Sequence, residues 1–147
     1  MKALYAGDRE RAKELGTDAE LDVFEAAALD EARQLQRLLG SNPELARSRS
    51  TDDFTALHYA AFFGGPAAAR LLVENGADVN AYADNELGVH VLNSAVAAGR
   101  GETVELLLEA GADPNAPTRT GHTPLDVALA NGDEEIAKML RAHGAVG

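Results

Sequence analysis

The chain has 147 residues, of which 46% are hydrophobic but only 5% aromatic, and its 24 acidic and 13 basic residues give a formal net charge of −11. This length suits one domain, and the acidic excess excludes nucleic acid and anionic membrane surfaces as expected partners. There is no cysteine for disulfide or thiolate chemistry. No apolar run approaches the roughly 18 residues that span a membrane, and the N-terminus has no signal-peptide pattern. We therefore expect a cytoplasmic protein.

The acidic charge has two interpretations. The charge can simply keep an Ala- and Leu-rich chain in solution. Alternatively, its negative field steers a partner that carries basic residues toward the protein.

The first 50 residues contain apolar helical segments with irregular boundaries. Residues 3–15 form one such segment, which contains Gly7. Residues 23–27 begin the next, and it continues past Asp30 to the pair Leu38-Leu39. A polar stretch then runs from Gly40 to residue 53 and separates these segments from a more regular region.

The regular region is built from one repeated unit. Residues 55–61 align with residues 90–96 and 123–129, and each copy is followed by a glycine and then by a Leu-Leu or Met-Leu pair. The turn at residues 75–81 returns almost unchanged at 110–116, and its opening returns at 143–145. The glycines of these turns are 35 and then 33 residues apart. A period of this length predicts stacked repeats, in which each unit buries its apolar face against its neighbours.

Each unit is expected to form two helices. Thr123 is a good N-cap, Pro124 fits the first helical position, and the carboxylate of Asp126 in the first turn interacts favourably with the helix dipole. The glycines after the first helix are predicted to adopt positive φ, and Asp30 takes the same place in the first full repeat. These glycines are Gly64, Gly99 and Gly132.

The motifs at residues 55–61 and 123–126, with the two Gly-Ala-Asp-x-Asn-Ala turns, resemble the ankyrin repeat. The resemblance implies an all-α solenoid of helix-turn-helix units with projecting β-turn hairpins and a concave binding face. It divides one ankyrin repeat domain, residues 1–147, into an N-terminal half-repeat or cap (1–20), a divergent repeat (21–50), a repeat (51–82), a repeat with a turn insertion (83–117) and a C-terminal capping repeat (118–147).

The third of these repeats departs from the motif in an informative way. It carries Asn93 where the motif has His, His90 where it has Thr, and two extra residues in its turn, around residues 84–88. The spacing of the aligned leucines places this insertion in a hairpin tip. Insertions on one face of a repeat stack often mark the binding side, although a neutral insertion fits the sequence as well.

The sequence favours no chemistry that needs an enzyme, a metal or a cofactor. Among the four histidines, no pair has the i, i+4 spacing of a zinc site, and there is no thiolate ligand. His58 resembles the structural histidine of the family, which hydrogen-bonds the turn backbone. There is no nucleophile elbow and no phosphate-binding glycine loop. We therefore predict a protein without catalytic activity, metal or cofactor.

The resemblance also places a binding surface on the hairpin tips and the first helix of each repeat. Three of the four phenylalanines fall in this set, and aromatic anchors are typical of interface hot spots. The alternative is that Phe62 packs under the neighbouring repeat. The candidate partner-binding residues are Asp52, Phe54, Phe62, Phe63, Glu86, Leu87, Arg119, His122 and Asn131.

Two functions follow from these observations. The first is a monomeric module that binds a protein partner through the concave face and hairpin tips, with Phe54 and Phe63 as anchors and Asp52, Asp84 and Glu86 as an acidic rim. The second is a structural module that forms a homo-oligomer through the same phenylalanines. Fold alone does not identify the partner.

Overall fold

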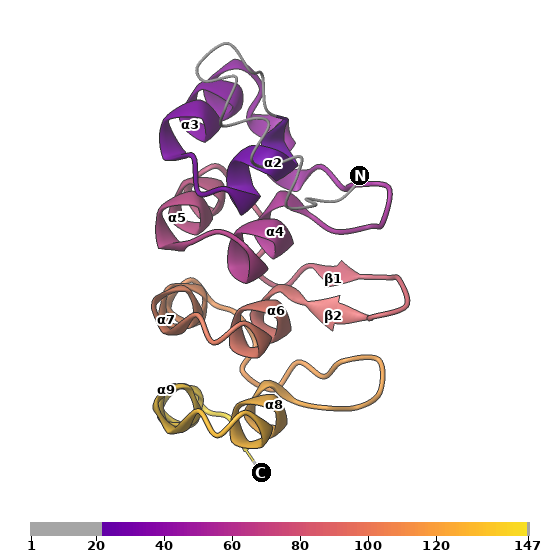
Figure 1. The fold of residues 1–147 in the computed structure, drawn as a ribbon, viewed down its shortest axis with the longest axis vertical. Helices are drawn as coiled ribbons and strands as arrows, with labels where there is room; N and C mark the ends of the chain where they lie inside the picture. The colour runs from indigo at the N-terminus through magenta and orange to yellow at the C-terminus, as the bar shows by residue number, and fades with distance from the viewer. Residues whose placement is uncertain (1–21, 147) are drawn as a thin grey trace.

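The computed structural model describes residues 22–146. These residues form the predicted pairs of helices (Figure 1). The predicted half-repeat of residues 1–20 lies outside the described residues. In chain order the elements are α2 (Val23–Ala28), α3 (Ala32–Ser41), the 3-10 helix η2 (Pro43–Arg47), α4 (Ala56–Phe62), α5 (Pro66–Glu74), β1 (Tyr82–Ala83), β2 (Val89–His90), α6 (Val91–Ala97), α7 (Gly101–Glu109), α8 (Pro124–Ala130) and α9 (Glu134–Ala142).

The helices form two parallel rows, as Figure 1 shows. The inner row consists of α2, α4, α6 and α8, and the outer row consists of α3, α5, α7 and α9. Hairpins project beside the inner row, and one of them contains the antiparallel pair β1–β2, in which Tyr82 faces His90 and Ala83 faces Val89. The predicted all-α stack of helix-turn-helix units is therefore confirmed.

The core repeats with the sequence. Helices α4, α6 and α8 of the inner row each bury a leucine against their neighbours, and the alanine three residues later lets the neighbouring helix approach closely. Each outer helix contributes one fully buried leucine from its apolar pair. These core positions are Leu57, Leu92 and Leu125, then Ala60, Ala95 and Ala128, and in the outer row Leu39, Leu72, Leu107 and Leu140.

Helix α8 begins at the cap that the sequence predicts. At the start of α8 the Thr123 hydroxyl accepts a hydrogen bond from the Asp126 N–H at 3.1 Å, and the Asp126 carboxylate accepts one from the Thr123 N–H at 2.9 Å. These bonds from Thr123 lower the pKa of the Asp126 carboxyl below its usual 3.8. The reciprocal pair satisfies two backbone donors at a helix end, so it fixes where α8 starts.

The turn motif Ala-Asp-x-Asn joins each repeat to the next. The amide of Asn80 donates to the carbonyl oxygen of Gly111 at 3.2 Å and accepts from the Asp113 N–H at 2.7 Å. Asn115 repeats this one unit later, where it donates to Gly144 and accepts from the Val146 N–H. The asparagine thus recurs because it links the backbones of successive turns.

One glycine prediction is wrong. Gly99 and Gly132 have φ of 71° and 70°, and Asp30 has φ of 55°, as expected, but Gly64 does not have a positive φ. The cause is Pro66. In α7 the N–H of the first residue donates back to the carbonyl of Gly99 at 3.2 Å, and proline lacks this donor. The chain before Pro66 is extended instead, which changes the turn.

Asp30 and Gly64 connect the first two described repeats. Gly65, the N-cap of α5, has no side chain, and the Asp30 carboxylate accepts the hydrogen bond from the Ala68 N–H at 2.9 Å in its place. A Cβ atom added at Gly64 would lie 2.1 Å from the carbonyl oxygen of Ala27 in α2. Gly64 is therefore required by close packing rather than by its backbone angles.

Two threonines are expected to respond in opposite ways to the same substitution. The hydroxyl of Thr103 in α7 is buried and has no hydrogen-bond partner within the described residues, whereas the hydroxyl of Thr123 caps α8. Replacing a buried hydroxyl without a partner by a methyl group removes a desolvation cost. We expect Thr103→Val to raise the free energy of unfolding by about 1 kcal/mol, and Thr123→Val to lower it by about 1 kcal/mol through loss of the cap.

Urea unfolding followed by circular dichroism measures both changes. Opposite signs for the same substitution are the expected result. A loss of stability in Thr103→Val would mean that the hydroxyl has a partner after all.

Candidate functional site

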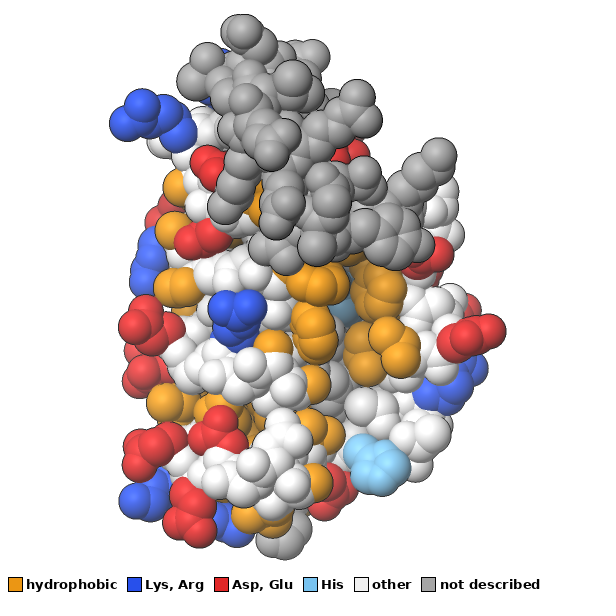
Figure 2. All heavy atoms as spheres, viewed as in Figure 1, with side chains coloured by type: hydrophobic (Ala, Val, Ile, Leu, Met, Phe, Trp, Pro, Cys, Tyr) orange, Lys and Arg blue, Asp and Glu red, His pale blue; other side chains and the backbone are white. Residues whose placement is uncertain are grey.

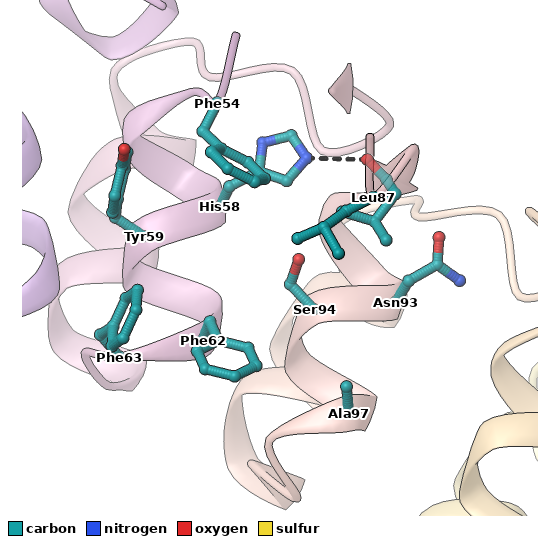
Figure 3. Close-up of a pocket in the computed structure, with 10 residues that line it drawn as sticks. Phe54, His58, Tyr59, Phe62, Phe63, Leu87, Asn93, Ser94 and Ala97 are labelled. Carbon is teal, nitrogen blue, oxygen red and sulfur yellow. Dashed lines mark hydrogen bonds between the residues drawn. The ribbon is translucent and has the colours of Figure 1, made fainter. Parts of the chain in front are cut away.

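A pocket of about 390 Å³ lies between α4 and α6, beside the tip of the β1–β2 hairpin (Figure 3). Its size falls within the range of sites that hold small ligands or large side chains. Its exposed lining is almost entirely apolar. The lining residues are Phe54, His58, Tyr59, Phe62, Phe63, Leu87, Val89, Asn93, Ser94 and Ala97.

Aromatic rings form the α4 side of this pocket. The Tyr59 ring lies 5.8 Å from Phe54 and 6.3 Å from Phe63, and Phe62 lies 4.9 Å from Phe63, all between ring centroids. Residues three and four apart on a helix share a face, so α4 presents Tyr59, Phe62 and Phe63 together. Phe54 joins them from the preceding hairpin, as Figure 3 shows. The rings thus form one continuous aromatic surface.

The hydroxyl end of Tyr59 is bound within the fold. It donates a hydrogen bond to the Ser50 hydroxyl at 3.2 Å. Burial is the main cause that raises the pKa of Tyr59, and the negative charges of Asp52 and Asp22 raise it further. Two carboxylates therefore lie close enough to this edge of the pocket to influence it.

His58 fixes the hairpin behind the pocket. Its Nδ1 accepts a hydrogen bond from the Thr55 N–H at 3.2 Å, so its Nε2 carries the proton and donates to the carbonyl oxygen of Val89 at 3.1 Å. Burial is the main cause that lowers the pKa of His58 from 6.5 to about 4. The ring is therefore neutral at pH 7 and acts as a bridge between α4 and β2, as the sequence predicts.

Asn93 holds the corresponding position in α6. Its side-chain oxygen accepts from the His90 N–H at 2.7 Å, and its amide nitrogen donates to the carbonyl oxygen of Ala116 at 3.0 Å. Asparagine thus also bonds to the following hairpin without a titratable group, but it does so at the opening of that hairpin rather than directly before the next helix cap.

The two-residue insertion lies at the hairpin tip, as predicted, and it closes the pocket. Asn85 organises the tip, because its side-chain oxygen accepts from the N–H groups of Leu87 at 2.9 Å and Gly88 at 3.1 Å. Its amide nitrogen donates to the carbonyl oxygen of Asp52 at 2.7 Å in the preceding hairpin. This turn directs Leu87 toward α6 at the mouth of the pocket (Figure 3).

The neighbouring hairpins hold this tip from both sides. Asp53, with φ of 65°, accepts from the Asp84 N–H at 2.8 Å. On the other side, the Arg119 guanidinium donates to the Asp84 carboxylate at 3.0 Å and to the carbonyl oxygen of Asn85. These contacts with Asp52, Asp53 and Arg119 make the tip a fixed part of the surface.

Four apolar side chains form an exposed patch over the pocket. We call Phe54, Phe62, Phe63 and Leu87 the aromatic patch. Leu87 is 65% exposed, Phe62 43% and Phe63 39%, while Phe54 is partly buried. Figure 2 shows apolar side chains gathered over the middle of this face, beside the hairpins. Large apolar side chains that stay exposed together are typical of interaction surfaces.

Comparison with known proteins supports the stacked-repeat fold. The family model for ankyrin repeats, three copies long, matches residues 23–118 and 84–146. The chain belongs to the ankyrin repeat family. Ankyrin repeats are protein–protein interaction modules, and the family is generally non-enzymatic.

Several curated ankyrin repeat proteins are similar to parts of the chain. Ankyrin repeat and SOCS box protein 16 of Mus musculus is 41% identical over 101 residues, which are 63% of this chain and 22% of that protein. Cyclin-dependent kinase 4 inhibitor B of Rattus norvegicus is 50% identical over 54 residues, 37% of this chain and 41% of that protein. The chain thus spans less than half the length of either relative.

The ankyrin hairpins and inner helices bring only some of the predicted site residues together. Phe54, Phe62, Phe63 and Leu87 meet at the pocket, and Phe62 is exposed rather than packed under the next repeat. Asp52 and Glu86 are exposed on the adjoining hairpins. Arg119 is engaged with the neighbouring hairpin tip, and His122 and Asn131 lie on the last described repeat, outside the pocket lining.

Sequence reasoning missed Tyr59 and Ser94. Both follow the structural His58 or Asn93 by one residue, so they occupy the same place in successive ankyrin repeats. Comparing this position across the repeats would have identified them as neighbours on the inner surface.

No described helix is both long enough and apolar enough to cross a bilayer. The described part of the chain also contains no group of three or more His, Cys, Asp or Glu side chains that could hold a metal ion.

Proposed function

We propose that this protein is a non-enzymatic module that binds a protein partner through its concave face, with the aromatic patch as the anchor. The observation that carries the proposal is the exposure of Phe62, Phe63 and Leu87 around an apolar pocket. Buried aromatic anchors in pockets are what dominate binding energy at protein interfaces. The fixed hairpin tip lowers the entropy cost of binding, because Leu87 is already in place.

The acidic residues on the hairpins supply the rim of this surface. Asp52 and Glu86 are exposed beside the aromatic patch, whereas the Asp84 charge is paired with Arg119 at 3.0 Å. Together with a net charge of −11, these carboxylates favour a partner that carries basic residues.

The relatives support a binding role without identifying the partner. Cyclin-dependent kinase 4 inhibitor B acts on another protein, as its name states, and it shares 54 aligned residues with this chain. The same class of function fits the present chain. Its own partner is defined here only by chemistry, as a protein with an apolar anchor near basic residues.

Affinity capture from a lysate of the source cells tests this function. The baits are the wild-type chain, the double variant Phe63→Ser/Leu87→Ser, and Leu129→Ser as a matched control, since Leu129 is exposed outside the pocket lining. Circular dichroism first establishes that all three are folded. We expect a protein that the wild type and the control retain and the double variant loses. Equal retention by all three baits would place the binding site elsewhere.

Charge steering gives a separate prediction for the retained protein. Its association rate constant is expected to fall steeply between low and physiological salt, because screening weakens the attraction to the acidic rim. Surface plasmon resonance at several salt concentrations measures this. A flat profile would remove steering from the proposal and leave the apolar anchor.

Self-association is the second candidate, because an exposed aromatic patch can bury itself against a second copy. Light scattering separates the two functions. A monomeric mass at all concentrations supports the partner-binding module, whereas a dimer that Phe63→Glu converts to a monomer supports a homo-oligomer.

A further inference from the structure

The pocket contains one polar group that the fold does not use. The side chains of His58, Tyr59 and Asn93 all make hydrogen bonds within the structure, as described above. The hydroxyl of Ser94 makes none within residues 22–146, although the residue is only 7% exposed. A serine inside a helix commonly bonds back to a carbonyl four residues earlier, so this free hydroxyl is unusual.

The position of this hydroxyl points to a ligand. Figure 3 shows the Ser94 side chain directed from α6 into the space between Phe62 and Leu87. A hydroxyl can donate one hydrogen bond and accept up to two. Leaving it unpaired in an apolar site costs free energy, so an occupant that bonds to it is favoured over one that does not.

The walls define the rest of the occupant. The ring contacts on the α4 side offer edges and faces to another aromatic ring, and such pairs are favourable beyond the area they bury. Tryptophan and tyrosine combine an aromatic body with one polar atom that seeks a partner when buried. The exposed carboxylates of Asp52 and Glu86 beside the pocket favour basic residues next to that ring.

We infer that the pocket between α4 and α6 binds a tryptophan or tyrosine side chain of the protein partner, flanked by basic residues, with the Ser94 hydroxyl as its hydrogen-bond partner. This inference rests on the proposed function and specifies the chemistry of the anchor. Ser94 thereby selects among aromatic anchors, while the aromatic patch supplies most of the contact.

Selection from a displayed library of random peptides supplies the probe. The wild-type chain is the bait, and each selected peptide is then measured against wild type and Phe63→Glu. We expect selected peptides to share a tryptophan or tyrosine next to lysine or arginine, and to lose binding to Phe63→Glu. Because the chain has no tryptophan, a blue shift of the peptide's own fluorescence reports burial of an indole ring.

A double-mutant cycle then tests Ser94 directly. The selected peptide and its copy with Phe in place of the Trp or Tyr are measured against wild type and Ser94→Ala, with Ser41→Ala on the exposed end of α3 as the matched control. We expect the wild type and the control to prefer the original peptide by about fivefold, the value of one ordinary hydrogen bond. Ser94→Ala is expected to lose this preference while still binding the Phe peptide.

The outcomes separate the inference from the proposed function. Peptides that bind the aromatic patch but carry leucine or phenylalanine as readily as tryptophan overturn the inference and leave the function. A preference that survives in Ser94→Ala does the same. Three results contradict both the inference and the proposed function. They are peptides whose binding is unchanged by Phe63→Glu, a wild-type chain that selects no peptide, and a dimer in light scattering that Phe63→Glu converts to a monomer.

Discussion

Gly64→Ala is expected to destabilise the protein by about 3 kcal/mol, the upper part of the range for overpacking a core. The added methyl group would lie 2.1 Å from the carbonyl oxygen of Ala27, which is backbone of α2 and has no side-chain freedom to move away. Helices α2 and α4 must therefore separate, and the packing between the first two described repeats is lost.

Gly132→Ala is the matched control, because Gly132 holds the same place in the last described repeat. Its φ is 70°, but nothing lies within 4 Å of an added Cβ atom. The expected cost is the backbone strain alone, about 1 kcal/mol. Urea unfolding measures both variants. A larger loss in Gly132→Ala than in Gly64→Ala would contradict the account of the turn at Pro66.

His58 is expected to make the stability of the protein depend on pH between about 4 and 6.5. In the unfolded chain the histidine binds a proton near its ordinary pKa of 6.5, whereas in the folded protein it does so only near 4. The unfolded state therefore holds more protons in this window, and the free energy of unfolding falls as the pH falls. The loss attributable to His58 is about 3 kcal/mol and is complete near pH 4.

His58→Asn isolates this contribution, because Asn93 holds the equivalent position in the next repeat and bonds to the following hairpin without a titratable group. The difference in unfolding free energy between wild type and His58→Asn is expected to shrink from pH 7 to pH 4, in favour of the asparagine variant at low pH. Chemical unfolding at a series of pH values measures it. Parallel curves for the two proteins would show that His58 is not buried neutral.

The repeat architecture could be predicted because its signals are local. Thr123 and Asp126 mark the start of a helix, and the asparagines of the turns recur at a fixed period. The same unit therefore occurs several times in one chain and can be recognised by comparing its copies. The insertion in the third repeat also located the hairpin tip and Leu87. These features depend on neighbours in sequence.

Features that depend on contacts between repeats could not be predicted in the same way. Gly64 has the same place in the motif as Gly99, but Pro66 alters its turn and a carbonyl of another repeat then requires glycine. Likewise, the sequence around Ser94 is that of an ordinary helix, and the pocket around its side chain forms only when α4 and the hairpin tip pack beside α6. Neither the local motifs nor the contacts between repeats identify the partner, because the same repeat fold binds many different proteins.

Hydrogen–deuterium exchange of the complete chain, with and without the protein retained in the capture, tests most directly where the partner binds. We predict slower exchange on binding in residues 54–63 and 84–98, which form the aromatic patch and the pocket. Residues of the outer helices α5, α7 and α9 are expected to exchange as before. Protection confined to the outer helices, with unchanged exchange at the hairpin tip, would contradict a binding site on the concave face.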